Sequence, residues 1–248
     1  MKPDIPVCDA HTHVGKWQFD VNHHSVRAVA HELARYGVTR FAVIISVPES
    51  PNVTHKTNLA LLEETHENQI DFFYWLDPRM TSIRELDSVA HQIVGVKLHP
   101  SYTRTRITDG RMGKFLDWCE ANSKPLLIHC GRWNKYADYR FAVNIATTRK
   151  MILILAHMGG PAYDIKTNAL DYIAKQKIKA RLMTDTSTCF QPYLIRKAVR
   201  TLGPENLLFG SDYPLYHPYP TMQNISIAKI PDKVRQRILG LNYLKLVA

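Results

Sequence analysis

The sequence has few features of a secreted or membrane protein. Its four cysteines form no Cys-x-x-Cys pair, which argues against a disulfide framework and favours reduced thiols. No apolar run reaches the roughly 18 residues that a membrane-spanning helix needs. Residues 1–15 also lack the apolar core and the small-residue cleavage site of a signal peptide. These absences predict a soluble, cytoplasmic protein with no membrane partner.

Acidic residues are fewer than basic ones, 22 against 32, so the 248-residue chain has a formal net charge of +10. A nucleic-acid-binding protein usually concentrates basic residues in a stripe with interleaved aromatics. Here the basic residues are scattered, and no block of five consecutive residues consists only of Lys and Arg. The pattern predicts a solvated basic surface and no nucleic-acid partner, with a field that attracts small anions as the alternative.

The chain alternates short apolar, β-branched runs with longer stretches of helical hydrophobic spacing. Near-continuous apolar strands separated by helices are typical of a parallel sheet that is buried on both faces. The expected strands cover 5–14, 39–46, 71–76, 94–100, 125–131, 151–159, 181–187 and 206–214. The expected helices cover 25–37, 55–68, 81–92, 113–123, 138–149, 164–178, 192–202 and 231–247.

Two architectures fit eight strand–helix units, an open doubly wound sheet and a closed barrel. A doubly wound sheet is disfavoured because no glycine-rich turn follows the first strand. The length is close to the roughly 250 residues of a (β/α)8 barrel, and no Pro-, Gly- or Ser-rich segment divides the chain. We therefore predict an α/β protein with a single (β/α)8 TIM barrel domain over residues 1–248.

Five of the eight expected strands end in residues that bind metals or transfer protons. Because barrel active sites form at the carboxyl ends of the strands, these residues are candidates for one site. A single histidine at such a position is more often a structural residue, but five coincidences favour a shared function. The residues are His11 and His13, His99, His129, His157 and Asp212.

His11 and His13 are the most specific pair, since residues two apart on a strand point to the same face. Imidazole suits Zn²⁺ and similar metals, and a catalytic zinc site needs about three protein ligands with one open position. His129 is the natural third nitrogen ligand. Asp212 supplies a carboxylate that can bind the metal and take a proton from water. His157 precedes a glycine pair and can polarise a carbonyl or shuttle a proton.

Seven segments together resemble the amidohydrolase superfamily, and within it the amidohydrolase-related (amidohydrolase 2) branch of metal-dependent hydrolases and decarboxylases. They occur in the family's order and span almost the whole chain. The segments are DAHTHVG (9–15), GVKLHP (95–100), PLLIHCG (125–131), ILAHMGG (154–160), DTS (185–187), LLFGSDYP (207–214) and ILGLNYLKLV (238–247).

The resemblance implies a set of site residues. It implies His11, His13, His129 and Asp212 as ligands of one divalent metal, most often zinc, and His157 as the catalytic or second-metal histidine. Some family members hold a second ion bridged by a carboxylated lysine from the fourth strand. Lys97 shares one face of that strand with His99, so these two residues either bind a second metal or contact substrate. We favour Lys97 as an ammonium that holds a substrate carboxylate.

Several further residues are expected near the barrel mouth. Substrate contacts are predicted for Trp17, Tyr102, Arg104, Arg132 and Trp133 because each follows a strand that carries a candidate ligand. Asp185 is expected either to orient a ligand histidine or to cap a turn. The chain is short for the branch, which leaves a pocket that is open or completed by a partner subunit, as in a homodimer. An aromatic loop over residues 213–220 departs from the family pattern.

The predicted function is that of a metal-dependent hydrolase. A metal-activated water attacks a small, anionic substrate that contains an amide, ester or lactone carbonyl. Asp212 accepts the proton of the water, and His157 stabilises the oxyanion. The alternative is a metal-dependent, non-oxidative decarboxylase of an aromatic or unsaturated carboxylic acid. A non-catalytic binding protein with a relict metal site is a third hypothesis, disfavoured because the ligand set is complete.

Overall fold

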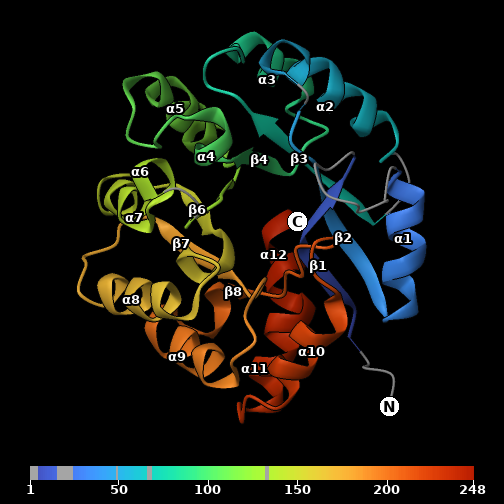
Figure 1. Ribbon diagram of the computed structural model, residues 1–248, viewed down its shortest axis with the longest axis vertical. Coiled ribbons are helices and arrows are strands. Elements are labelled where there is room, and N and C mark those ends of the chain that lie inside the picture. Colours follow the sequence, from blue (N-terminus) through green and yellow to red (C-terminus); the bar gives the residue numbers. More distant parts are fainter. Residues whose placement is uncertain (1–4, 16–24, 49, 66–68, 132–133) are drawn as a thin grey trace.

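The computed structural model describes residues 5–15, 25–48, 50–65, 69–131 and 134–248. Eight parallel strands form one sheet in the order β1 to β8, and helices lie around it (Figure 1). The strands are β1 (Val7–Val14), β2 (Val38–Ile45), β3 (Ile70–Leu76), β4 (Gly95–Leu98), β5 (Leu126–Ile128), β6 (Ile152–Leu155), β7 (Arg181–Asp185) and β8 (Leu207–Leu208). This arrangement confirms the predicted (β/α)8 barrel.

The segment that follows β8 brings the last strand back to the first. The amide of Ala10 donates to the carbonyl of Phe209 at 2.9 Å, and the amide of Asp212 donates to the carbonyl of His11 at 2.8 Å. A further bond of 2.7 Å runs from the amide of His13 to the carbonyl of Tyr213. These three bonds nearly close the barrel, and they place Asp212 beside the two histidines of β1.

The helices agree with the prediction in eight places and add three further ones. The helices are α1 (Val26–Arg35), α2 (Thr54–Glu63), α3 (Ile83–Val89), α4 (Pro100–Thr103), α5 (Gly113–Ala121), α6 (Asn134–Ala137), α7 (Tyr139–Thr148), α8 (Tyr163–Ile173), α9 (Pro192–Leu202), α10 (Pro218–Ser226), α11 (Asp232–Gln236) and α12 (Asn242–Val247). The prediction missed α4, α6 and α10. It treated 213–220 as a loop, whereas α10 begins at Pro218, where proline suits the first helical turn and His217 caps the end.

Several strands are shorter than the apolar runs that predicted them. The run 206–214 contains only two strand residues, and the run 151–159 leaves the sheet after Leu155. The backbone of His157 and that of Asp212 are left-handed, with φ of 60° and 64°. Non-glycine residues in this region are strained and concentrate at functional sites. The ends of these two runs therefore form the mouth of the barrel rather than more sheet.

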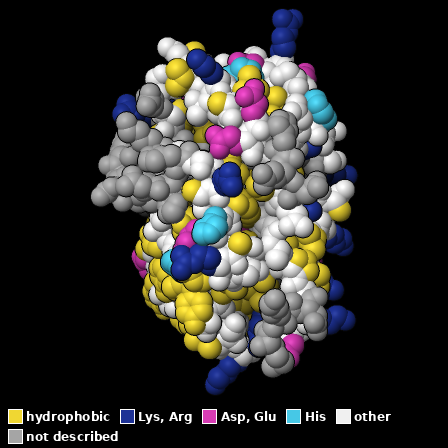
Figure 2. Space-filling view, turned by 90° about the vertical axis from the view of Figure 1, so that its right-hand side faces the viewer, with side chains coloured by type: hydrophobic (Ala, Val, Ile, Leu, Met, Phe, Trp, Pro, Cys, Tyr) yellow, Lys and Arg dark blue, Asp and Glu magenta, His cyan; other side chains and the backbone are white. Residues whose placement is uncertain are grey.

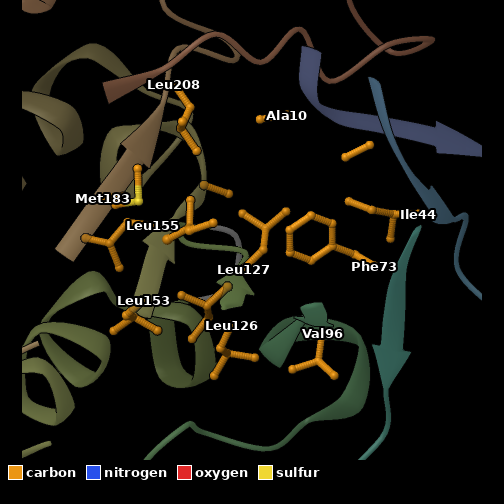
Figure 3. Packing of buried hydrophobic residues seen from close by; sticks show 14 of the residues in the cluster. Ala10, Ile44, Phe73, Val96, Leu126, Leu127, Leu153, Leu155, Met183 and Leu208 are labelled. Atoms are coloured by element: carbon orange, nitrogen blue, oxygen red, sulfur yellow. The ribbon is translucent and has the colours of Figure 1, made fainter. Parts of the chain in front are cut away.

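Apolar side chains from different strands fill the space that the strands enclose (Figure 3). Phe73 of β3 and Leu127 of β5 both belong to this buried core. Gly95 makes room for this packing, because a Cβ atom on it would lie 2.6 Å from the Phe73 ring and 2.5 Å from the carbonyl oxygen of Pro125. The interior is thus a packed core, and the polar residues lie at its carboxyl end.

Gly240 is a second position where the backbone leaves no room for a side chain. It lies in the π-helical segment Arg237–Leu241, and a Cβ atom on it would lie 1.9 Å from the carbonyl oxygen of Pro6. We expect Gly240→Ala to lower the free energy of unfolding by about 3 kcal/mol, measured by urea denaturation. Gly113→Ala is the control, since its Cβ meets nothing within 4 Å. Equal denaturation midpoints for the two variants would contradict this packing.

On the face shown in Figure 2, Lys and Arg side chains are spread from one end of the molecule to the other rather than gathered in one stripe. Within the described ranges, none of the helices combines the length and the apolar character that crossing a bilayer requires.

Candidate metal centre

Three potential ligand atoms converge at the carboxyl end of the barrel. His11 Nε2 lies 3.2 Å from His13 Nε2, and Asp212 Oδ1 lies 3.5 Å and 3.3 Å from these two atoms. All three side chains are buried. Tetrahedral coordination with bonds of about 2.1 Å places ligand atoms about 3.4 Å apart. The spacing therefore fits a divalent metal ion.

The hydrogen bonds of the two histidines determine which of their ring nitrogens face this cluster as acceptors. His11 Nδ1 lies 2.9 Å from Asp185 Oδ2 and donates to it, and His13 Nδ1 faces the carbonyl of Ile45 at 3.4 Å. Each Nε2 atom then presents a lone pair rather than a proton. Burial lowers the pKa of His13 to about 4, so this imidazole is neutral at pH 7. Two lone pairs and a carboxylate oxygen thus face one another, an arrangement that a cation stabilises.

Lys97 supplies positive charge at the same place. Its Nζ atom donates to His11 Nε2 at 2.9 Å, and the side chain is fully buried. Burial lowers the pKa of Lys97 to about 8, against the opposing charges of Asp212 and Asp185. Lys97 therefore lies within the centre and is still mostly protonated at neutral pH, and its role toward a second metal or a substrate stays a prediction.

Asp212 is ionised in this environment. Burial alone would raise the pKa of its carboxyl group, but His157, His11 and His13 hold it well below its ordinary value. An ionised carboxylate whose oxygen belongs to the three-atom cluster can bind a metal and accept a proton. These are the two properties that the sequence predicted for Asp212.

Asp185 joins His11 and His157 into a second polar group, next to the cluster of His11, His13 and Asp212. Its Oδ2 atom accepts from His11, while Oδ1 accepts from the amides of His157 and Ser187, each at 3.0 Å, and from the Ser187 hydroxyl. Burial opposes ionisation of Asp185, but His11 and its hydrogen bond hold the pKa below its ordinary value. His11, His157 and Asp185 also have metal-binding spacing. Hydrogen bonds already join them, so this group needs no cation.

His129 lies beside His157 rather than among the three converging atoms. Its Nδ1 atom is 3.1 Å from His157 Nε2. Its Nε2 atom is buried without a hydrogen-bond partner among the described residues. Burial lowers the pKa of His129 well below its ordinary value, so the imidazole is neutral. A neutral, unpartnered Nε2 atom is chemically suited to bind a metal, and the ligand role of His129 stays a prediction.

His99 joins the site through ring contacts. Its ring stacks on that of His129 with centroids 3.8 Å apart, and it also lies against Trp75 and Tyr102. Its Nδ1 atom is buried with no hydrogen-bond partner in the described part of the chain. The structure thus brings both members of the predicted pair, Lys97 and His99, to the centre. Lys97 contacts His11, whereas His99 contacts His129.

A cavity of about 270 Å³ lies next to these aromatic side chains, and Trp75, Tyr102 and Arg104 line part of it. Arg79 also lines it but is paired with Asp77. Arg104 is exposed and makes no ion pair with any described residue. Two of the five predicted substrate contacts, Tyr102 and Arg104, therefore line a pocket. The other three, Trp17, Arg132 and Trp133, lie outside the described residues.

Two residues of the site were not expected from the sequence. Ser187 hydrogen-bonds with both Asp185 and His157, and Lys166 is buried behind the loops that carry them. The segment DTS drew attention to Asp185 alone. The partners of Ser187 and Lys166 are separated from them by up to 30 residues, so no local pattern reveals these contacts.

Comparison with protein families places the chain in one of them. A family model described as Amidohydrolase matches residues 8–247, nearly the full length. No protein of curated function matches the chain by sequence. The match agrees with the resemblance that the seven sequence segments suggested.

Solved structures with the same fold include enzymes of two reaction types. The 5-carboxyvanillate decarboxylase from Sphingomonas paucimobilis is 17% identical, with a TM-score of 0.72 and coverage of 98% of this chain and 99% of that one. A probable 2-pyrone-4,6-dicarboxylic acid hydrolase from Acinetobacter baumannii is 15% identical, with a TM-score of 0.73 and coverage of 98% and 99%. A dihydroxybenzoic acid decarboxylase from Polaromonas contains manganese and is 14% identical, with a TM-score of 0.69 and coverage of 98% and 97%. At these identities the likeness concerns the fold.

Proposed function

The chain belongs to the amidohydrolase family, and we propose that it is a metal-dependent hydrolase of a small, anionic substrate with an amide, ester or lactone carbonyl. One observation carries the proposal. Two imidazole lone pairs and an ionised carboxylate oxygen lie 3.2–3.5 Å apart. We propose His11, His13, His129 and Asp212 as the ligands and zinc as the ion, although one structural neighbour contains manganese.

The metal and the protein divide the chemistry between them. A divalent ion held by these residues would supply Lewis acidity toward a carbonyl oxygen and toward water in contact with it. The Asp212 carboxylate accepts the proton of the attacking water, because its depressed pKa keeps it ionised at neutral pH. It then passes this proton to the leaving group.

The cationic residues suit an anionic substrate. Lys97 places an ammonium group within the centre, 2.9 Å from His11 Nε2. Arg104 lines the neighbouring cavity, and its guanidinium forms no ion pair among the residues that the structure describes. We propose that the substrate reaches from the metal centre into the cavity. Its scissile carbonyl lies at the centre, and its carboxylate pairs with Lys97 or with Arg104.

The position of His157 alone does not support the predicted role in stabilising the oxyanion, because both of its ring nitrogens have protein partners. Its Nδ1 atom lies 2.7 Å from the Ser187 hydroxyl, and its Nε2 atom lies 3.1 Å from His129 Nδ1. The predicted oxyanion role requires a proton on a ring nitrogen that faces substrate. Both nitrogens have protein partners in this conformation. We therefore propose that His157 acts first by orienting His129, and that an oxyanion role requires it to leave that contact.

Decarboxylation is the second candidate, and the Lys97 ammonium favours it. Decarboxylation replaces the lost carboxylate with a proton on carbon, so it needs an acid near the metal. Burial brings the pKa of Lys97 to about 8, which makes it a better proton donor than an ordinary lysine at neutral pH. The resulting neutral amine is then reprotonated from solvent.

Isotope-labelled water distinguishes the two reactions. The metal-loaded protein would be incubated with panels of lactones, esters, amides and aromatic carboxylic acids in water enriched in ¹⁸O. We expect a new product carboxylate that contains ¹⁸O and no release of CO₂. Release of CO₂ with no ¹⁸O in the organic product would overturn hydrolysis in favour of the second candidate. The metal-free protein, measured alongside, controls for uncatalysed reaction.

A further inference from the structure

A continuous chain of hydrogen bonds leads from Asp185 through Ser187 and His157 to His129. The Ser187 hydroxyl contacts Asp185 Oδ1 and also lies 2.7 Å from His157 Nδ1. His157 Nε2 in turn lies 3.1 Å from His129 Nδ1. Asp185, Ser187 and His157 are almost completely buried. Solvent therefore has little access to rearrange these bonds.

The direction of every bond in this chain follows from proton counting. An ionised carboxylate only accepts, so the single hydroxyl proton of Ser187 goes to Asp185. The Ser187 oxygen must then accept from His157, which places the ring proton of His157 on Nδ1. A neutral imidazole has one N–H group, so His157 Nε2 accepts and His129 Nδ1 donates. The ring of His157 is almost completely buried, which favours its neutral form.

The same argument determines the protonation of His129 Nε2, the last atom of this hydrogen-bonded chain. Since the one ring proton of neutral His129 lies on Nδ1, its Nε2 atom carries a lone pair. This atom is buried and has no hydrogen-bond partner among the described residues. A histidine that binds a metal usually has its other ring nitrogen held by a hydrogen bond that fixes the tautomer.

We propose that Ser187 is a positioning residue for His129. Ser187 donates to Asp185 and accepts from His157, and His157 in turn accepts from His129 Nδ1. These bonds hold His129 in the tautomer that can bind metal through Nε2. This inference rests on the proposed metal site and extends it. Asp185 then orients two ligands, His11 directly and His129 through two intermediates. A carboxylate beside His129 itself would add negative charge to the site. The relay, as we call the hydrogen-bonded chain from Asp185 through Ser187 and His157 to His129, instead places neutral groups next to the His129 ring.

Lys166 holds the two loops that form the relay. Its Nζ atom donates to the carbonyls of Gly160 and Pro161, each at 2.7 Å, and to Thr188 Oγ1 at 3.0 Å. The first two acceptors follow His157 in the chain, and Thr188 follows Ser187. All three ammonium protons are therefore used in joining the loop after β6 to the loop after β7. This clamp keeps Ser187 within hydrogen-bonding distance of His157.

The tautomers can be measured in the metal-free protein by long-range ¹H–¹⁵N NMR of ¹⁵N-histidine-labelled full-length chain. We expect the proton on Nδ1 in both His157 and His129. In Ser187→Ala, His157 loses its acceptor, and we expect a second tautomer of His157 and of His129 to become populated. A proton on Nε2 of either ring in the wild-type protein would overturn the proposal, and this experiment does not depend on how well any variant folds.

Zinc affinity provides an independent readout. We expect Ser187→Ala to weaken Zn²⁺ binding by about 10- to 100-fold, measured by competition with a chromophoric chelator. Ser187→Thr keeps the hydroxyl and should restore binding. Thr184→Val is the matched control, because it removes a buried hydroxyl on β7 whose hydrogen bond within the described chain goes to the Leu155 carbonyl. Unchanged affinity in a folded Ser187→Ala protein would contradict the proposal.

Failure of this inference and failure of the proposed function have different signatures, because neither readout uses turnover. Predicted tautomers and weakened zinc binding support the relay even if no hydrolysis is found, and that combination would overturn the proposed function alone. Hydrolysis by a protein whose Ser187→Ala variant keeps wild-type tautomers and affinity would overturn the relay alone.

Discussion

Asp212→Asn is expected to lower kcat/KM by about 10³-fold or more while the fold stays intact. An amide cannot accept the proton of the attacking water, and it removes a negative charge from the proposed metal site. The side chain is 7% exposed and lies within 3.5 Å of His11 and His13, so no other carboxylate can replace it without rearrangement. The measurement is steady-state kinetics on the substrate identified by the ¹⁸O assay.

Three measurements make the Asp212→Asn result interpretable. Circular dichroism and the urea midpoint report whether the variant folds. The zinc content of the variant separates loss of the base from loss of the metal. Asp232→Asn is a control on an exposed carboxylate that pairs with Arg235 at 2.8 Å. An Asp212→Asn protein that turns over at the wild-type rate would exclude Asp212 as the base.

Asp185→Asn is expected to lower the free energy of unfolding by about 3–5 kcal/mol, because it leaves buried hydrogen-bond donors of a fully buried network without an acceptor. Four donors converge on the Asp185 carboxylate, from His11, the amides of His157 and Ser187, and the Ser187 hydroxyl. An asparagine offers one oxygen, and its NH₂ group would face donors. Urea denaturation of the metal-free protein measures this loss.

A surface variant provides the comparison for Asp185→Asn. Asp171 pairs with Lys197 at 2.7 Å, but its side chain is 55% exposed, so Asp171→Asn should cost no more than about 1 kcal/mol. The two variants make the same chemical change in buried and exposed settings. If both have the same urea midpoint as the wild-type protein, Asp185 is not the structural centre of the site.

The repeating units of the fold were predictable because each strand is an apolar run bounded by helical stretches. The ends of those runs were not. His157 and Asp212 lie in sequence stretches that look like strand, but their backbones are left-handed and turn the side chains toward the barrel mouth. Periodicity identifies buried segments, and it does not show where a strand leaves the sheet to form a site.

The polar groups of the site were predictable to different degrees. His11 and His13 share a strand, so their common face follows from spacing alone. Asp212 required closure of the barrel, which depends on bonds between segments about 200 residues apart in the chain. Lys166 falls in an amphipathic helix, where a lysine is expected to face solvent, yet it is fully buried and bonded to two loops. Such contacts depend on tertiary packing, which sequence patterns do not encode locally.

The central claim is that His11, His13 and Asp212 hold a divalent metal. Anomalous diffraction from crystals grown with stoichiometric Zn²⁺ tests it most directly. The account predicts one strong peak about 2.0–2.2 Å from His11 Nε2, His13 Nε2 and a carboxylate oxygen of Asp212, with His129 Nε2 as the fourth protein ligand. A protein that binds Zn²⁺ elsewhere, or shows no anomalous peak between these side chains, would contradict it.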